Sequence, residues 1–262
     1  MTNGGLGRRL RSRRPTARLL TEYWGRKLPQ IEANADLRAC LQYATRGSVA
    51  IDVGASVGNY AAAISRRVGP TGQVLALEPN PEVYAELVRS TWGTNVVALN
   101  LAASVEAGVA TLAVPTSGAD HHAPLGTLQP LTGEAATYAV RCVPLDHLVE
   151  QHRPVSLIKI DVEGHERAVM AGARETIERH APALVVEIEA RHTSPETVVR
   201  TVEDLIDLGY TCTPLSGFGT MRWEDFNVDA NQSNHLTADG AAILAGHEQS
   251  YVNNFLFTPK RT

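Results

Sequence analysis

The sequence predicts an α/β protein whose mostly parallel sheet is covered by helices on both faces. Short apolar runs alternate with amphipathic segments from residue 49 to residue 258. The first apolar run, 49–53, ends in a glycine turn and leads into a predicted helix at 59–68. Runs that alternate with helices in this way are typical of parallel strands buried on both sides. Such sheets bind ligands at the carboxyl ends of their strands.

The remaining elements follow in the same order along the chain. Two stretches without periodicity interrupt them, 115–137 and 216–250, and loops of that length often act as lids or binding loops. Strands at 109–114 and 138–143 flank the first loop and are predicted to pair with each other. Further strands are predicted at 73–77, 95–99, 155–160, 183–188, 210–214 and 251–258, and helices at 31–45, 82–91, 144–149, 166–179 and 195–208.

The net charge of −4 is distributed unevenly along the 262 residues. Residues 1–28 carry many arginines against one acid, Glu22, and no apolar core follows them, so this arm is not a secretory signal. The arm is interpreted either as a solvated tail or as a means of peripheral association with an anionic membrane surface or a lipid-linked substrate. Nucleic acid is a disfavoured partner, because the rest of the chain is acidic.

Cysteine usage indicates the cellular compartment. Cys40, Cys142 and Cys212 are scattered without the spacing of a zinc site or a disulfide framework. This usage is typical of a reducing compartment, and no apolar run is long enough to span a bilayer. We therefore expect a cytoplasmic protein.

The glycine turn after the first strand discriminates between nucleotide ligands. A dinucleotide fingerprint needs glycine at its middle position, because the pyrophosphate approaches the backbone there. Ser56 holds that position, which disfavours a nicotinamide cofactor and tolerates a nucleoside ligand without phosphate, such as S-adenosylmethionine (SAM). Gly54 and Gly58 let the chain turn and the ligand approach. Asn59 and Tyr60 begin the following helix and are predicted to lie near the amino-acid end of SAM.

Two later stretches are predicted to complete the cofactor site. Glu78 ends the second strand, where a carboxylate with two acceptor oxygens suits both ribose hydroxyls. Ala102, Ala103 and Ser104 follow the third strand and are small enough to leave room for adenine. The predicted cofactor-binding residues are Asp52, Gly54, Ser56, Gly58, Asn59, Tyr60, Glu78, Asn80, Ala102, Ser104 and Asp161.

Five separated stretches resemble one known family. They are IDVGASVGNY, LALEPNP, IKIDVEGHE, LVVEIE and NNFLFTP, in that order. The chain resembles the FkbM-type methyltransferases within the class I SAM-dependent methyltransferases, and IKIDVEGHE after an upstream glycine turn is the most specific feature. The sequence departs from the family at Val105, where the pattern predicts an acid after Ser104.

The resemblance implies a fold and an activity. The fold is a Rossmann-like, seven-stranded sheet whose last strand is antiparallel and inserted between the fifth and the sixth. The activity is O-methylation of a hydroxyl on a sugar, a glycolipid or a polyketide-type small molecule, with SAM as cofactor. We expect a basic arm with short helices at 1–48 and the methyltransferase domain, with loop and hairpin insertions, at 49–262.

Charged residues gather at the exit of the strand 155–160. An alcohol must lose its proton during methyl transfer, and His165 is the natural proton acceptor near neutral pH. The alternative is that His165 is a histidine at a helix start that faces solvent or caps a carbonyl. Lys159 lies inside an apolar strand and needs a partner, for which Glu187 on the next strand is the candidate. Lys159, Asp161 and Glu187 either line an acceptor pocket as further catalytic residues or form a buried ion bridge.

Other histidines lie in predicted loops and are expected to be solvated. They are His121, His122, His192 and His235, with 120–122 as a candidate lid segment. Asp161 and Glu187 offer carboxylates that suit a hard cation, but their spacing is too weak a signal to predict a metal.

Two other functions compete with methyl transfer. A nicotinamide-dependent oxidoreductase is disfavoured by Ser56. A non-catalytic SAM-binding or interaction protein on the same scaffold is disfavoured by the joint presence of Asp52, Glu78, Asp161 and His165, which an inert scaffold does not need.

Overall fold

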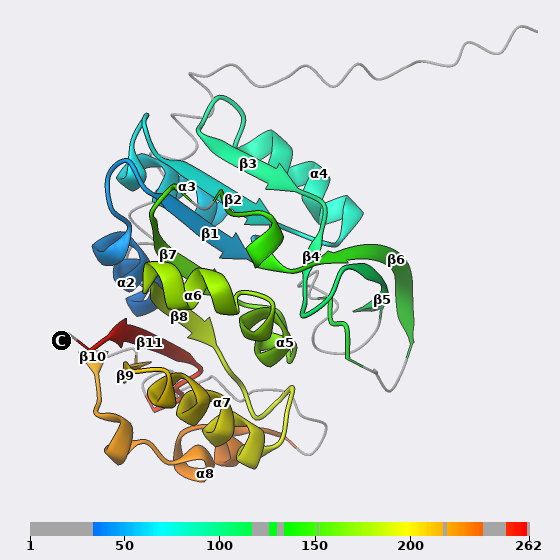
Figure 1. The fold of residues 1–262 in the computed structure, drawn as a ribbon. Helices are drawn as coiled ribbons and strands as arrows, with labels where there is room; N and C mark the ends of the chain where they lie inside the picture. Colours follow the sequence, from blue (N-terminus) through cyan, green and yellow to red (C-terminus); the bar gives the residue numbers. More distant parts are fainter. Residues whose placement is uncertain are drawn as a thin grey trace, which may run out of the picture.

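A large mixed sheet organises the molecule, with helices on both of its faces (Figure 1). The computed structural model describes residues 34–116, 126–129, 134–150, 152–216, 219–237 and 250–260. The sheet has eight strands in the order β10-β9-β11-β8-β7-β1-β2-β3. These strands are β1 (Val49–Val53), β2 (Gln73–Leu77), β3 (Val96–Leu99), β7 (Val155–Ile160), β8 (Ala183–Glu187), β9 (Tyr210–Ser216), β10 (Gly219–Thr220) and β11 (Asn254–Pro259).

The sheet confirms the predicted class. β3, β2, β1, β7 and β8 run parallel to one another, and β11 runs antiparallel between β8 and β9. The expected seven strands are joined at the edge by β10, a two-residue strand that pairs with β9. The order reverses at β1, which places the β1, β2 and β7 carboxyl ends around one crevice.

Two apolar layers hold the helices against the sheet. Helices α5, α6 and α7 pack on one face, and α2, α3 and α4 pack on the other. Alternate residues of β1 serve the two layers, with Ile51 and Val53 in the first and Ala50 in the second. The helices are α2 (Ala35–Tyr43), α3 (Asn59–Val68), α4 (Pro81–Ser90), α5 (Glu166–Ala171), α6 (Arg174–His180), α7 (Pro195–Asp207) and α8 (Val228–Asn231), with 3-10 turns η2 (Leu145–His147), η3 (Trp223–Asp225) and η4 (Ser233–His235).

Helix α2 belongs to the second of these layers. Its residues Leu37 and Cys40 are fully buried beside Leu157 and Val185 of the sheet. The proposed boundary at residue 49 stays a prediction, and α2 on its N-terminal side shares the core of the sheet. No helix within the described part of the chain is long and apolar enough to cross a membrane.

The helix predicted at 166–179 is divided into two, α5 and α6. A Cβ on Gly172 would lie 2.0 Å from the carbonyl oxygen of Ser104, so the chain passes Ser104 too closely for a larger residue between the two helices. Asp146 then caps the second helix, because its Oδ1 accepts from the N–H of Thr176 at 2.8 Å and its Oδ2 from that of Glu175 at 3.0 Å. The single-helix prediction was wrong because both causes lie far away in the sequence.

A second, three-stranded sheet projects beside the carboxyl ends of β2 and β3. It contains β4 (Ala102–Ala103), β5 (Gly108–Pro115) and β6 (Ala135–Val143), and the predicted pairing of the two long strands is confirmed. Both strands reach further than predicted, and Thr127 forms a bridge with Ala113, so part of the predicted 115–137 loop is ordered pairing. The candidate lid segment 120–122 lies outside the described residues.

Candidate active site

A pocket opens at the carboxyl ends of β1, β2 and β7, under the small sheet. Its lining joins apolar side chains to a few polar ones, which is typical of small-molecule sites. We call Gly54, Ser56 and Glu78 the β2 side of the pocket, and Asp161, Glu163 and His165 the β7 side. The other lining residues are Val53, Leu77, Pro79, Leu101, Ala102, Ala103, Leu112, Gly126, Leu128 and Val162.

The glycine turn has the close packing that its sequence predicts. Gly54 has φ +77°, and a Cβ there would lie 1.7 Å from the backbone oxygen of Asp161, so only glycine fits. Gly58 has φ +90°, and a Cβ there would lie only 2.8 Å from the side chain of Leu87 in α4. Gly58 therefore serves helix packing and lies outside the pocket lining, whereas Gly54 joins the two sides of the pocket.

Glu78 is held in the pocket by backbone donors. Its Oε2 accepts from the N–H of Ser56 at 2.9 Å, and its Oε1 accepts from that of Asn80 at 2.8 Å. Burial is the main cause that raises the pKa of Glu78 to about 7, and the two backbone bonds oppose it. Each oxygen has a further lone pair, so the carboxylate can still accept two hydroxyl hydrogens.

Asn80 has a structural role next to Glu78. Its side-chain oxygen accepts from the N–H of Glu82 at 3.0 Å and caps α4. The side chain is buried and lies outside the pocket lining, so Asn80 shapes the site through its backbone.

His165 and Ser104 meet at the β7 side. Ser104 Oγ lies 3.0 Å from His165 Nε2, and the half-buried imidazole lines the pocket. Burial lowers the pKa of His165, which keeps the ring neutral near pH 7. A neutral imidazole accepts a proton, and its contact with Ser104 orients the ring.

Lys159 lies outside the pocket lining, in a buried network of charges that includes the lining residue Asp161. Its Nζ contacts Asp161 Oδ2 at 3.0 Å and lies 3.9 Å from Asp52 Oδ1. The ring of Tyr60 lies against the same ammonium, 4.6 Å from ring centroid to Nζ, and the Tyr60 hydroxyl bonds to Asp36 of α2. Burial raises the pKa of Asp52 to about 6, against the opposing charge of Lys159.

The predicted pairing of Lys159 with Glu187 is wrong, and the register explains why. β7 and β8 place Lys159 opposite Val185, two residues before Glu187. β1 and β7 place Lys159 opposite Asp52, so this carboxylate is its neighbour on the same face of the sheet. Glu187 instead accepts a hydrogen bond from Asn253 at 2.9 Å. Burial, together with Asp161 and Glu189, raises the pKa of Glu187 well above its ordinary value.

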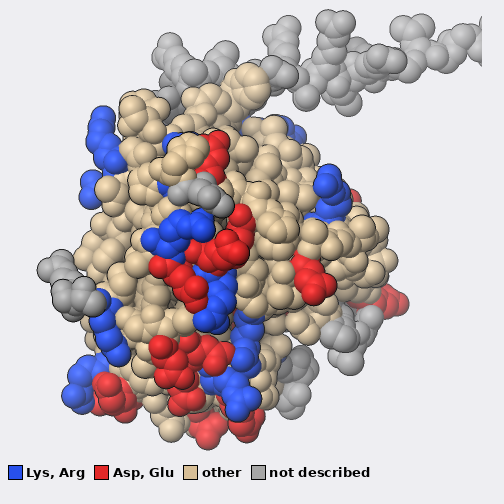
Figure 2. Space-filling model, in the orientation of Figure 1, with Lys and Arg blue, Asp and Glu red and all other residues tan. Residues whose placement is uncertain are grey.

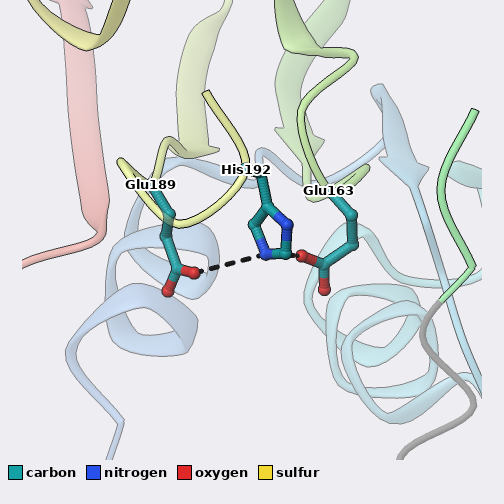
Figure 3. Close-up of side chains that lie close together, drawn as sticks. All are labelled: Glu163, Glu189 and His192. Atoms are coloured by element: carbon teal, nitrogen blue, oxygen red, sulfur yellow. Dashed lines mark ion pairs between the residues drawn. The ribbon is translucent and has the colours of Figure 1, made fainter. Parts of the chain in front are cut away.

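A cluster of side chains that the sequence reasoning missed lies against the β7 side. Glu163 and Glu189 approach the imidazole of His192 from opposite sides (Figure 3). Glu189 Oε2 lies 3.5 Å from His192 Nε2, and Arg191 Nε donates to the same oxygen at 2.9 Å. Burial opposes protonation of His192, but the two carboxylates raise its pKa to about 9. The sequence signal was an acid and a histidine three residues apart, directly after a strand end.

The prediction that His192 and His235 are solvated was therefore wrong. His192 has only 22% of its side chain exposed, and His235 is buried with its Nε2 3.0 Å from the carbonyl oxygen of Ala230. His121 and His122 lie outside the described residues.

The pocket lining contains only part of the predicted site. Gly54, Ser56, Glu78, Ala102, Asp161 and His165 line it, and Ser104 contacts His165. The other predicted residues, Asp52, Gly58, Asn59, Tyr60, Asn80, Lys159 and Glu187, lie outside the lining.

Comparison with known proteins identifies the family. The sequence matches the methyltransferase FkbM domain over residues 52–212, which is more than half of the chain. The chain belongs to the FkbM methyltransferase family. The resemblance seen in the sequence is thereby confirmed, and SAM is the cofactor of this class.

Several FkbM and other methyltransferases are similar to the chain. Hexuronic acid methyltransferase AglP of Haloferax volcanii is 26% identical over 224 residues, 83% of this chain and 84% of that protein. The FkbM methyltransferase of Methylobacillus flagellatus has a TM-score of 0.47 and 19% identity over 80% of this chain, which spans only 43% of that protein. Fibrillarin of Aeropyrum pernix, crystallised with S-adenosyl-L-methionine, has a TM-score of 0.47 and 16% identity, with coverage of 86% and 76%.

Proposed function

We propose that the protein transfers the methyl group of SAM to a hydroxyl of a sugar-type acceptor, free or lipid-linked. The observation that carries this proposal is the composition of the pocket at its two sides. The β2 side presents a carboxylate held by backbone, and the β7 side presents a neutral imidazole beside the side chain of Asp161. The hexuronic acid acceptor named for the relative from Haloferax volcanii supports a sugar.

The β2 side fits the nucleoside part of SAM. Glu78 keeps free lone pairs for the two ribose hydroxyls, and Ala102 and Ala103 leave space beside them. Ser56 has φ +48° and places a side chain where a pyrophosphate would need bare backbone. This arrangement favours SAM over a dinucleotide and speaks against the oxidoreductase alternative.

The β7 side fits the chemistry of a hydroxyl acceptor. When bound, SAM supplies an electrophilic methyl group on its sulfonium. His165 accepts the proton of the acceptor hydroxyl at a ring nitrogen, and Ser104 holds the ring in place. Asp161 lines the same side and is held by Lys159, so the lysine positions this carboxylate from below. The remaining contribution is the alignment of the acceptor with the methyl group.

Acidic and basic side chains are interspersed on the face of the molecule that Figure 2 shows. The described residues form no continuous basic surface on that face. This mixed charge is compatible with a small acceptor, and the role of the basic N-terminal arm in membrane association stays a prediction.

A transfer assay tests the proposed function. The full chain is incubated with methyl-labelled SAM and with neutral hexoses, hexuronic acids and their lipid-linked forms. We expect label that resists mild alkali, because a methyl ether survives conditions that cleave a methyl ester. Alkali-labile label would place the methyl group on a carboxylate. Tight SAM binding without transfer to any acceptor would support the non-catalytic alternative.

A further inference from the structure

The structure assigns a divalent metal site to Glu163, Glu189 and His192, at the β7 side of the pocket. The three residues each offer one ligand atom, and these atoms lie within 4.8 Å of one another. An imidazole with two carboxylates is a mixed nitrogen and oxygen set, which suits Mn²⁺, Fe²⁺, Co²⁺ or Zn²⁺ better than Ca²⁺. Figure 3 shows the two carboxylates converging on the imidazole from opposite sides.

The geometry at His192 suits a metal ligand as well as an ion pair. Its Nε2 is buried and makes no hydrogen bond of acceptable geometry with any described residue, although carboxylate oxygens of Glu163 and Glu189 lie next to it. A hydrogen bond needs the N–H to point at the acceptor. A metal between the three groups would take the lone pair of His192 Nε2 in place of a proton, and it would need no N–H that points at an oxygen.

The surrounding residues hold the carboxylates in place. Asn253 donates to Glu189 Oε1 at 2.6 Å. Arg191 donates to Glu189 Oε2 at 2.9 Å and also lies 3.7 Å from Glu163 Oε2, so its guanidinium joins the two carboxylates. The backbone at Glu163 has φ +53°, and its carbonyl accepts from Thr127 Oγ1 at 2.7 Å. Metal ligands are commonly oriented by such outer partners, and a strained backbone held by tertiary contacts is typical of functional loops.

The position of the cluster gives the metal a role. Glu163 lines the pocket, on the side where His165 also lies. A divalent ion there would bind oxygens of the acceptor and so orient its reacting hydroxyl. His165 would still act as the base. This role rests on the proposed function, whereas the site itself does not.

Metal binding is measured directly, on the full chain after treatment with a chelator. Calorimetry with Mn²⁺ and Zn²⁺, and the electron paramagnetic resonance of Mn²⁺, report binding without any acceptor. His192→Ala and Glu163→Gln should each weaken binding at least about tenfold, and Asn253→Ala by about 10–100-fold because it removes an outer partner. The matched control is His152→Ala, since His152 forms a similar but exposed pair with Glu150 at 3.4 Å.

Two results decide the proposal. Tighter binding by the wild type and the His152 variant than by the cluster variants, with melting temperatures showing folded protein throughout, supports the site. Equal binding by the wild type and His192→Ala overturns it and leaves a closed ion-pair cluster. Methyl transfer that persists without metal binding would contradict the role given to the metal, while the proposed function stands.

Discussion

The two sides of the pocket are built in different ways. On the β2 side, Glu78 is held by backbone N–H groups of Ser56 and Asn80, all close to the glycine turn and the next strand end. On the β7 side, Glu163 and His192 come from separate loops and contact each other through their side chains. Backbone donors follow from the fold class, whereas a side-chain cluster depends on how particular loops meet. The contacts of the β2 side are therefore expected from the fold class, whereas those of the β7 side are particular to this chain.

Gly54 connects the two sides, and its replacement should have the largest effect. In Gly54→Ala the new Cβ would overlap the carbonyl of Asp161 at 1.7 Å, at a φ that disfavours alanine. We expect a loss of more than about 4 kcal/mol in the free energy of unfolding, a large share of the stability of a typical domain. Gly93→Ala is the control, because its φ of +78° matches and nothing lies within 4 Å, so only about 1 kcal/mol is lost. Equal losses in urea unfolding would refute the clash.

Lys159 lies beneath both sides and should have the next largest effect. Lys159→Met leaves Asp52 buried without a countercharge, which costs about 3–5 kcal/mol of stability. Adding Asp52→Asn to the variant should recover part of that loss, because the orphaned charge is then removed. Urea unfolding of the single and double variants measures both values. A Lys159→Met variant as stable as the wild type would show that Asp52 carries no charge in the native state.

Glu78 tests the β2 side alone. Glu78→Ala should remove the proposed charge-assisted hydrogen bonds to the ribose and weaken SAM binding by about 2–3 kcal/mol, or about 30–150-fold. Glu82→Ala is the control, since Glu82 follows in α4 and lies outside the pocket lining. Calorimetric titration with SAM measures both variants. Wild-type affinity in a folded Glu78→Ala protein would remove the ribose assignment.

The pH profile tests the β7 side with a smaller effect. Burial lowers the pKa of His165, so the neutral, proton-accepting form persists below the ordinary value of 6.5. The kcat/KM of the wild type, which reports the pKa of the free enzyme, should therefore fall only when the pH drops through a midpoint below 6.5. His165→Ala should lose this acid limb. A midpoint above 6.5, or an unchanged limb in the variant, would point to another base.

The sequence predicted one side of the pocket better than the other, and the reason is physical. Gly54, Ser56 and Glu78 sit at strand ends whose order follows from alternating apolar runs, so their meeting could be inferred. The partner of Lys159 depends on a register that a sequence alone does not give. His192 looked like a loop histidine, because its burial depends on a turn folding back onto Glu163. Methyl transfer followed from family motifs, but the acceptor did not.

The central claim is that the β2 side binds the cofactor and the β7 side handles the acceptor. A crossed measurement of SAM affinity and kcat on Glu78→Ala and His165→Ala tests it most directly. We predict that His165→Ala lowers kcat by about 10²–10⁴-fold with SAM affinity unchanged, whereas Glu78→Ala weakens SAM binding. A His165→Ala variant that loses SAM affinity, or that keeps its kcat, would contradict this division of the pocket.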